Sequence, residues 1–134
     1  MRTHVEFKSE AFPAYPGEED EVNPDLWGKR LAEFVTLELQ KRDIQSNEIY
    51  SEDWGWAIPL QNDKFKMWIG CGRYQEYPDG YLVFIEPSKP TITKFLFKKI
   101  DTTSDVSHIS DAIDEILRSH SEIRDIRWWS ENEK

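Results

Sequence analysis

The sequence predicts an α+β fold, in which a central antiparallel β-meander carries two α-helices packed on one face. Within residues 52–86, apolar residues alternate with small or polar ones in three runs separated by turn-rich segments, as in half-buried strands. Residues 24–41 and 105–119 instead repeat apolar residues at helical spacing. With strand-like segments at residues 2–8 and 123–129, the expected order is β-α-β-β-β-(β)-α-β.

The two turns of the meander set its expected register. The first hairpin should close over Asn62-Asp63. Its cross-strand pairs are then Leu60 with Phe65, Ile58 with Met67, Trp56 with Ile69 and Trp54 with Cys71. The second turn, residues 77–81 (YPDGY), has Pro and Gly where a type I turn accepts them, and it brings Val83 and Ile85 beside the same apolar row. These side chains define an inner face that the helices should cover.

The opposite, outer face of the meander has small residues flanked by aromatic and charged ones. Its expected members are Asp53, Gly55, Ala57, Lys66, Trp68, Gly70, Gly72, Tyr74, Leu82, Phe84 and Glu86. Glycines inside strands mark the close approach of another backbone or of a ligand. Two interpretations follow: a helix or the N-terminal arm packs on these glycines, or the glycines form the floor of a functional groove.

The N-terminal third of the chain predicts a strand and a helix. Residues 2–8 alternate weakly, which indicates a strand at the edge of the sheet. Asn23-Pro24-Asp25 predicts the helix start, because Asn caps helices, Pro suits the first helical position and Asp favours the positive end of the dipole. Gly28 is expected to permit a close contact between this helix and the sheet.

The C-terminal third begins with an ambiguous segment, residues 91–100 (TITKFLFKKI). Its β-branched residues favour a strand, although several side chains also fit one helical face. Residues 101–105 (DTTSD) supply caps for the second helix. Residues 123–129 (IRDIRWW) indicate a final strand, and the tail, residues 130–134, is expected to fray.

Length and composition limit the class of protein. The chain has 134 residues, which fits a single domain spanning 1–134. With 26 acidic and 17 basic residues, its formal net charge is −9, which argues against a general affinity for nucleic acids or anionic membranes. The charge suits a basic protein partner, mimicry of nucleic acid, or solubility alone. One cysteine and the lack of an apolar leader predict a cytoplasmic protein.

No recognised catalytic or metal-binding motif occurs in the sequence. Cys71 should face the apolar inner side as an inert thiol. The three histidines, His4, His108 and His120, lack the spacing of metal ligands. We therefore expect no catalytic residue, no metal and no cofactor.

Six residues make up the candidate binding site. Six tryptophans are more than one core easily buries, and Trp68 and Trp129 are the best candidates for partial exposure beside Lys66 and Arg127. The alternative is that the N-terminal arm covers them. The other four candidates surround the glycine floor; they are Glu52, Asp53, Tyr74 and Glu86. Paired carboxylates can perform acid–base chemistry or hold a hard cation.

Several strings of the sequence resemble a family of small bacterial hypothetical proteins. They are NPDLWGKRLAEF, EDWGW, MWIGCG, YPDGYLVFIEPSKP, KKIDT and DIRWW, and they extend over nearly the whole chain. The resemblance implies a bacterial, single-domain protein. It carries no activity, cofactor or catalytic residue over to this sequence.

Together these observations predict a non-catalytic, acidic, cytoplasmic protein-binding domain whose partner is a basic protein, as with small immunity or antitoxin-like proteins. We expect a monomer or weak homodimer that binds neither nucleic acid nor membranes. The alternative is a small-molecule-binding or hydrolytic enzyme that uses the carboxylates and aromatic residues of the outer face. An open concavity on that face favours the enzyme, and a covered or flat surface favours the binding domain.

Overall fold

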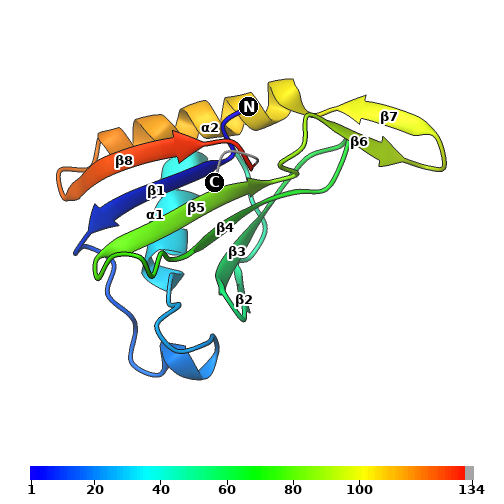
Figure 1. Ribbon diagram of the computed structural model, residues 1–134. Coiled ribbons are helices and arrows are strands. Elements are labelled where there is room, and N and C mark those ends of the chain that lie inside the picture. Colours follow the sequence, from blue (N-terminus) through cyan, green and yellow to red (C-terminus); the bar gives the residue numbers. More distant parts are fainter. Residues whose placement is uncertain (132–134) are drawn as a thin grey trace.

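The computed structural model describes residues 1–131 and confirms the α+β class (Figure 1). Its main sheet has six antiparallel strands in the order β2-β3-β4-β5-β1-β8, and β6 and β7 form a separate two-stranded sheet. The strands are β1 (His4–Ser9), β2 (Tyr50–Glu52), β3 (Gly55–Leu60), β4 (Met67–Arg73), β5 (Gly80–Glu86), β6 (Thr91–Lys94), β7 (Lys98–Asp101) and β8 (Ile123–Trp129). The helices are α1 (Lys29–Gln40), α2 (Thr103–Arg118) and a short 3-10 helix, η1 (Glu18–Asp20). The tail expected to fray lies largely outside the described residues.

Both helices cover the inner face of the main sheet, as the sequence predicts. α1 packs on β3 and β4, and α2 packs on β5 and β8. The alternating side chains of the strands meet the apolar stripes of the helices in one core, where Ile58, Ile69 and Val83 are fully buried with Val35 and Ile113. Each such side chain contributes about 1.5–3 kcal/mol by leaving water. Within residues 1–131, no helix lies over the outer face (Figure 1).

The register between β3 and β4 differs from the expected one by two residues. Trp56 pairs with Cys71, and Ile58 pairs with Ile69. The connecting loop is longer than a tight turn because the Asn62 side-chain oxygen accepts the backbone N–H groups of Lys64 and Phe65 at 2.8 and 3.1 Å. A shift by two residues preserves which side chains face inward, so the predicted faces survive the wrong register.

The register between β4 and β5 is also different from the prediction. The backbone of Gly80 donates to the carbonyl of Tyr77 at 3.1 Å, so the expected turn forms. However, Tyr81 pairs with Arg73 and not with Tyr77. The Arg73 guanidinium donates to the carbonyls of Tyr77, Pro78 and Gly80 at 3.2, 2.7 and 2.9 Å. These bonds stabilise a wide loop between the strands in place of a tight hairpin.

Trp54 lies on the outer face, so the prediction that Trp54 and Trp56 both face inward was wrong. Trp54 belongs to the turn between β2 and β3, where Gly55 has a φ of +150°. Its ring centre lies 5.8 Å from that of Trp68 and 5.1 Å from that of Phe84. Trp56 does face inward, and its Nε1 donates to Glu18 at 3.0 Å. The two tryptophans separate because regular alternation begins only at Gly55.

β1 is an interior strand, whereas its weak alternation predicted an edge. It pairs with β5 on one side and with β8 on the other. Its polar residues therefore have partners on neighbouring strands: Arg127 Nε donates to the carboxylate of Glu6 at 2.8 Å, and Nη2 of the same guanidinium forms an ion pair with it at 2.7 Å. The edges of the sheet are β8 and the short β2, a strand that the sequence did not reveal.

α1 begins at Lys29, and not at the Pro24 start that the Asn23-Pro24-Asp25 signal predicted. Asp25 has a left-handed φ of 65°, which is incompatible with a continuous helix. The backbone N–H of Asn23 donates to the Asp53 carbonyl at 2.8 Å and ties this segment to the β2–β3 turn. The expected close contact at Gly28 is present, because a Cβ there would lie 2.5 Å from the carbonyl oxygen of Cys71.

The first turn of α1 is capped from a distance by Glu18, which is only 2% exposed. One carboxylate oxygen of Glu18 accepts the backbone N–H groups of Gly28 and Lys29 at 2.8 and 2.9 Å, together with Trp56 Nε1. The other oxygen accepts the N–H of Tyr15 at 2.9 Å. A negative charge at this position satisfies otherwise unpaired helix donors and complements the helix dipole.

Residues 91–101 form a β-hairpin made of β6 and β7, which agrees with the strand interpretation of the ambiguous segment. Lys94 pairs with Lys98, so the tip consists of Phe95, Leu96 and Phe97. After the hairpin, Asp101 Oδ1 accepts the backbone N–H and hydroxyl of Thr103 at 2.8 and 2.6 Å, as expected for a helix-capping segment. β8 has the predicted bounds, Ile123–Trp129.

Candidate functional site

The outer face of the main sheet carries a transverse row of residues that crosses all six strands. The pairings place Tyr50, Ala57, Gly70, Phe84, His4 and Trp129 opposite one another in that order. The row joins residues from both ends of the chain, because β1 and β8 lie beside the meander. Small residues thus occupy its centre and aromatic residues occupy its two ends.

One end of the face is a cluster of three rings. Trp54 stacks on Trp68 with ring centres 5.8 Å apart, and the Phe84 ring centre lies 5.5 Å from that of Trp68. All three side chains are half-buried, so each keeps part of its ring in contact with solvent. Aromatic pairs in this geometry stabilise one another by about 0.5–1.5 kcal/mol. The cluster therefore forms a packed apolar surface on the outer face.

The glycines of the outer face are covered by the chain itself. A Cβ on Gly70 would lie 2.3 Å from the end of the Phe84 ring, and a Cβ on Gly72 would lie 2.6 Å from the carbonyl oxygen of Trp54. The close approach predicted from these glycines is present. Neither a helix nor the N-terminal arm provides it; a ring on the next strand and the β2–β3 turn do. Phe84 consequently occupies the space above Gly70 that a groove would need.

The other end of the face is more polar and more buried. His4 stacks on Trp129 with ring centres 5.8 Å apart, and the ring centre of Tyr74 lies 6.1 Å from that of Trp129. The Arg127 guanidinium lies 4.9 Å from the centre of the Trp129 ring and pairs with Glu6. Trp129 is 3% exposed, so the prediction of its partial exposure was wrong. Burial, followed by a hydrogen bond with Glu76, raises the pKa of Tyr74.

The candidate carboxylates do not come together. Glu52 pairs with Gly55 at the start of β3, whereas Glu86 aligns through Trp68 with Pro59 near its end. At about 3.3 Å per residue and about 4.8 Å per strand, the two positions are about 13 Å apart along the strands and about 14 Å apart across them. Carboxylates that act on one bond lie about 5–10 Å apart.

Each candidate carboxylate instead borders the aromatic surface. Glu52 and Asp53 are exposed in and beside the β2–β3 turn that carries Trp54. Glu86 lies directly across from Trp68, and burial raises its pKa. The structure therefore brings Trp68 together with Glu86 and separates both from Tyr74 and Trp129.

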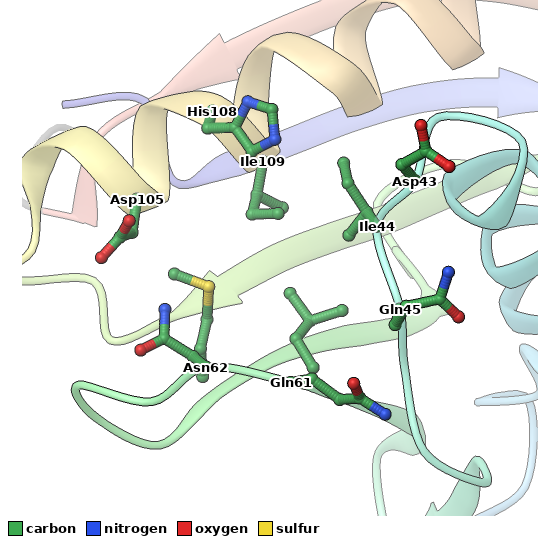
Figure 2. A pocket seen from close by; sticks show the side chains of 10 residues that line it. Asp43, Ile44, Gln45, Gln61, Asn62, Asp105, His108 and Ile109 are labelled. Carbon is green, nitrogen blue, oxygen red and sulfur yellow. The ribbon is translucent and has the colours of Figure 1, made fainter.

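A cavity of about 300 Å³ opens between the loop after α1, the β3–β4 loop and the first turns of α2 (Figure 2). Four apolar side chains form its floor; they are Ile44, Leu60, Met67 and Ile109. Its polar lining consists of Asp43, Gln45, Gln61, Asn62, Asp105 and His108. Asp105 is paired with Lys64 at 3.1 Å, and Asn62 holds the β3–β4 loop. The lining contains no thiol or hydroxyl nucleophile.

Within residues 1–131, no three His, Cys, Asp or Glu side chains come together in a way that could hold a metal ion. In the same part of the chain, neither helix is both long and apolar enough to cross a membrane.

Cys71 is fully buried on the inner face, as predicted, and burial raises the pKa of its thiol. The thiolate is the reactive form, so both accessibility and ionisation oppose modification. We expect a thiol reagent such as Ellman's reagent to leave the native protein unmodified and to react fully in denaturant. Rapid stoichiometric reaction of the native protein would contradict this assignment.

Sequence reasoning missed three residues of the outer face. His4 was considered only as a metal ligand, Trp54 was assigned to the inner face, and Tyr50 was assigned to no strand. The alternation of His4 with Val5 indicated that the two side chains lie on opposite faces of a strand. Nothing in the sequence of β1 or β8 indicated that these strands extend the transverse row of the outer face. The chain matches no family model, no curated protein and no solved structure.

Proposed function

We propose that this chain is a non-catalytic protein-binding domain of the bacterial cytoplasm, and that it binds a basic protein through the aromatic end of its outer face. The observation that carries the proposal is the half-buried cluster of Trp54, Trp68 and Phe84 on the outer face. No helix of the described residues, 1–131, covers this face of the sheet (Figure 1). Aromatic residues are enriched at the centres of protein interfaces, and tryptophan is prominent among those that dominate binding energy.

The charge beside this cluster supports a basic partner. Glu52 and Asp53 are exposed near Trp54, and Glu86 lies across from Trp68. The whole chain has a formal net charge of −9. Complementary charge around an apolar centre accelerates association and selects against acidic partners. This is the arrangement expected of a small immunity or antitoxin-like protein, with the domain a monomer or weak homodimer before it binds.

A hydrolytic function has less support. The carboxylates that it would need are far apart by strand spacing, and Phe84 fills the space above Gly70. An aromatic surface whose glycine floor is filled by Phe84 suits a macromolecule better than a small ligand, because small-molecule sites are concave and bury most of the ligand.

The proposal is tested by photocrosslinking in the host with a benzoyl-phenylalanine residue at position 68. A matched control carries the same residue at Ser107, which is exposed on α2, a helix of the covered face. We expect position 68 alone to give a discrete adduct, with a protein of basic isoelectric point identified by mass spectrometry. Absence of any adduct, or equal adducts from both positions, would count against the outer face as the interface.

A second measurement uses the partner once it is purified. Trp68→Ala should weaken the affinity for this partner by about thirtyfold, which corresponds to a loss of about 2 kcal/mol of binding free energy. Leu37→Ala, which removes an exposed apolar side chain from α1, should change the affinity by less than about twofold. Circular dichroism of both variants verifies the fold.

A further inference from the structure

The β6–β7 hairpin presents three consecutive large apolar side chains to solvent at its tip. Phe95 is 78% exposed, and Leu96 and Phe97 are each 88% exposed. The hairpin forms a sheet of its own and projects away from the main sheet (Figure 1). Among residues 1–131, no part of the body shields the tip.

The turn at the tip is poorly suited to the residues that occupy it. Phe95 and Leu96 have positive φ angles of 49° and 40°. Gly and Asn are the residues that most readily adopt a positive φ, because a bulky side chain is strained there. Phe and Leu at these positions oppose both turn formation and solubility. A requirement of folding does not explain them, so a contact made by the tip is the better explanation.

The hairpin also has a charge opposite to that of the body. Residues 91–101 contain Lys94, Lys98, Lys99 and Asp101, a net charge of +2. Since the whole chain has a net charge of −9, the remainder carries −11. Lys94 turns back to the body, where its Nζ donates to the carbonyl of Lys64 at 2.8 Å. Lys98 and Lys99 are both exposed, so these two are the basic groups that the hairpin presents to a partner.

We propose that the tip of the β6–β7 hairpin inserts into the interfacial region of an anionic phospholipid bilayer, with Lys98 and Lys99 contacting lipid phosphates. Three side chains that are each at least 78% exposed must be surrounded on most of their surface to leave water. A fluid bilayer can surround them without a preformed pocket. Apolar insertion combined with a basic cluster provides the two signals that peripheral attachment requires. The expectation of no membrane affinity rested on the negative net charge of the whole chain, whereas the hairpin has a positive net charge.

The first test is flotation of the full chain with vesicles made of equal parts phosphatidylcholine and phosphatidylglycerol. We expect the protein to float with these vesicles and to remain unbound with pure phosphatidylcholine. Lys98→Gln/Lys99→Gln should weaken binding by about thirtyfold, at about 1 kcal/mol per lysine. The matched control, Lys41→Gln/Lys66→Gln, removes two exposed lysines elsewhere and should leave binding unchanged.

The second test separates binding from folding. Phe95→Asn/Leu96→Gly gives the tip the residues that its φ angles favour, so this variant should melt at the same temperature as the parent or higher. It should nevertheless bind anionic vesicles about a hundredfold more weakly, because two large apolar side chains are lost. Vesicle binding equal to that of the parent would overturn the proposal.

The third test reports the environment of the tip. Leu96→Cys can be labelled selectively with an environment-sensitive nitrobenzoxadiazole dye, because Cys71 is fully buried. Anionic vesicles should shift the emission to the blue and increase it, and high salt should reverse the change. An unchanged spectrum would overturn the proposal. So would a blue shift that needs no vesicles and grows with protein concentration, since that result would assign the tip to a second copy of the chain.

Discussion

Replacing Glu18 with alanine is expected to lower the free energy of unfolding by about 3–5 kcal/mol, the range for removing one member of a buried charged network. The Glu18 carboxylate is 2% exposed and accepts four N–H groups, from Tyr15, Gly28, Lys29 and Trp56. Alanine leaves all four donors in a buried site without an acceptor, and the first turn of α1 loses its cap. Urea denaturation followed by circular dichroism measures the loss.

The neighbouring Glu19 provides the control, because it belongs to the same acidic run but is exposed. Glu19→Ala should change the free energy of unfolding by less than about 0.5 kcal/mol. Glu18→Gln should have an intermediate effect, since its amide oxygen still accepts hydrogen bonds while its NH₂ group faces donors. If the Glu18 and Glu19 alanine variants unfold at the same urea concentration, the proposed capping role is wrong.

Replacing Gly28 with alanine is expected to lower the free energy of unfolding by about 2–3 kcal/mol. The added Cβ would lie 2.5 Å from the carbonyl oxygen and 3.0 Å from the carbonyl carbon of Cys71. These are backbone atoms of the central strand β4, so they cannot move without disturbing its pairing with β3 and β5. The φ of Gly28 is −171°, an extended conformation open to any residue, so the predicted loss is steric.

Gly70→Ala is the matched comparison for Gly28→Ala. Its Cβ would meet the end of the Phe84 ring at 2.3 Å, but that half-exposed ring can turn away. We expect Gly70→Ala to lower the free energy of unfolding by about 1 kcal/mol. When Phe84→Ala is present in the same chain, the effect of the Gly70 substitution should be smaller. Thermal denaturation of the three variants and of Gly70→Ala/Phe84→Ala tests this. If Gly70→Ala destabilises the protein more than Gly28→Ala, a clash with a side chain is no easier to relieve than a clash with the backbone, and the explanation is wrong.

The periodicity of the sequence was sufficient to predict the two faces of the sheet. Ile58, Ile69 and Val83 are buried on the inner face as expected, even though both predicted registers were wrong. Side-chain direction depends on the local backbone, which repeats every two residues in a strand. Pairing depends on where the connecting loops end, and those loops are held by Asn62 and Arg73 through contacts that no repeat encodes.

The candidate site was only partly predictable for the same reason. The outer-face membership of Trp68 and Phe84 follows from strand alternation. The positions of His4 and Trp129 beside them require β1 and β8 to pair, although these strands are separated by most of the chain. Trp54 was misplaced because it belongs to a turn, where alternation does not apply.

By itself, the sequence determined the α+β class, the inner and outer faces and the bounds of β8, because these depend on short-range periodicity. Only the tertiary structure decided that Glu18, among four adjacent acidic residues, caps α1, and that one aromatic row crosses six strands. Nothing in the composition or spacing of the acidic run distinguishes the buried carboxylate from its exposed neighbours. The difference arises only when distant segments of the chain bring N–H donors to Glu18. The exposed tip of the β6–β7 hairpin is likewise visible only once the rest of the chain has folded without covering it.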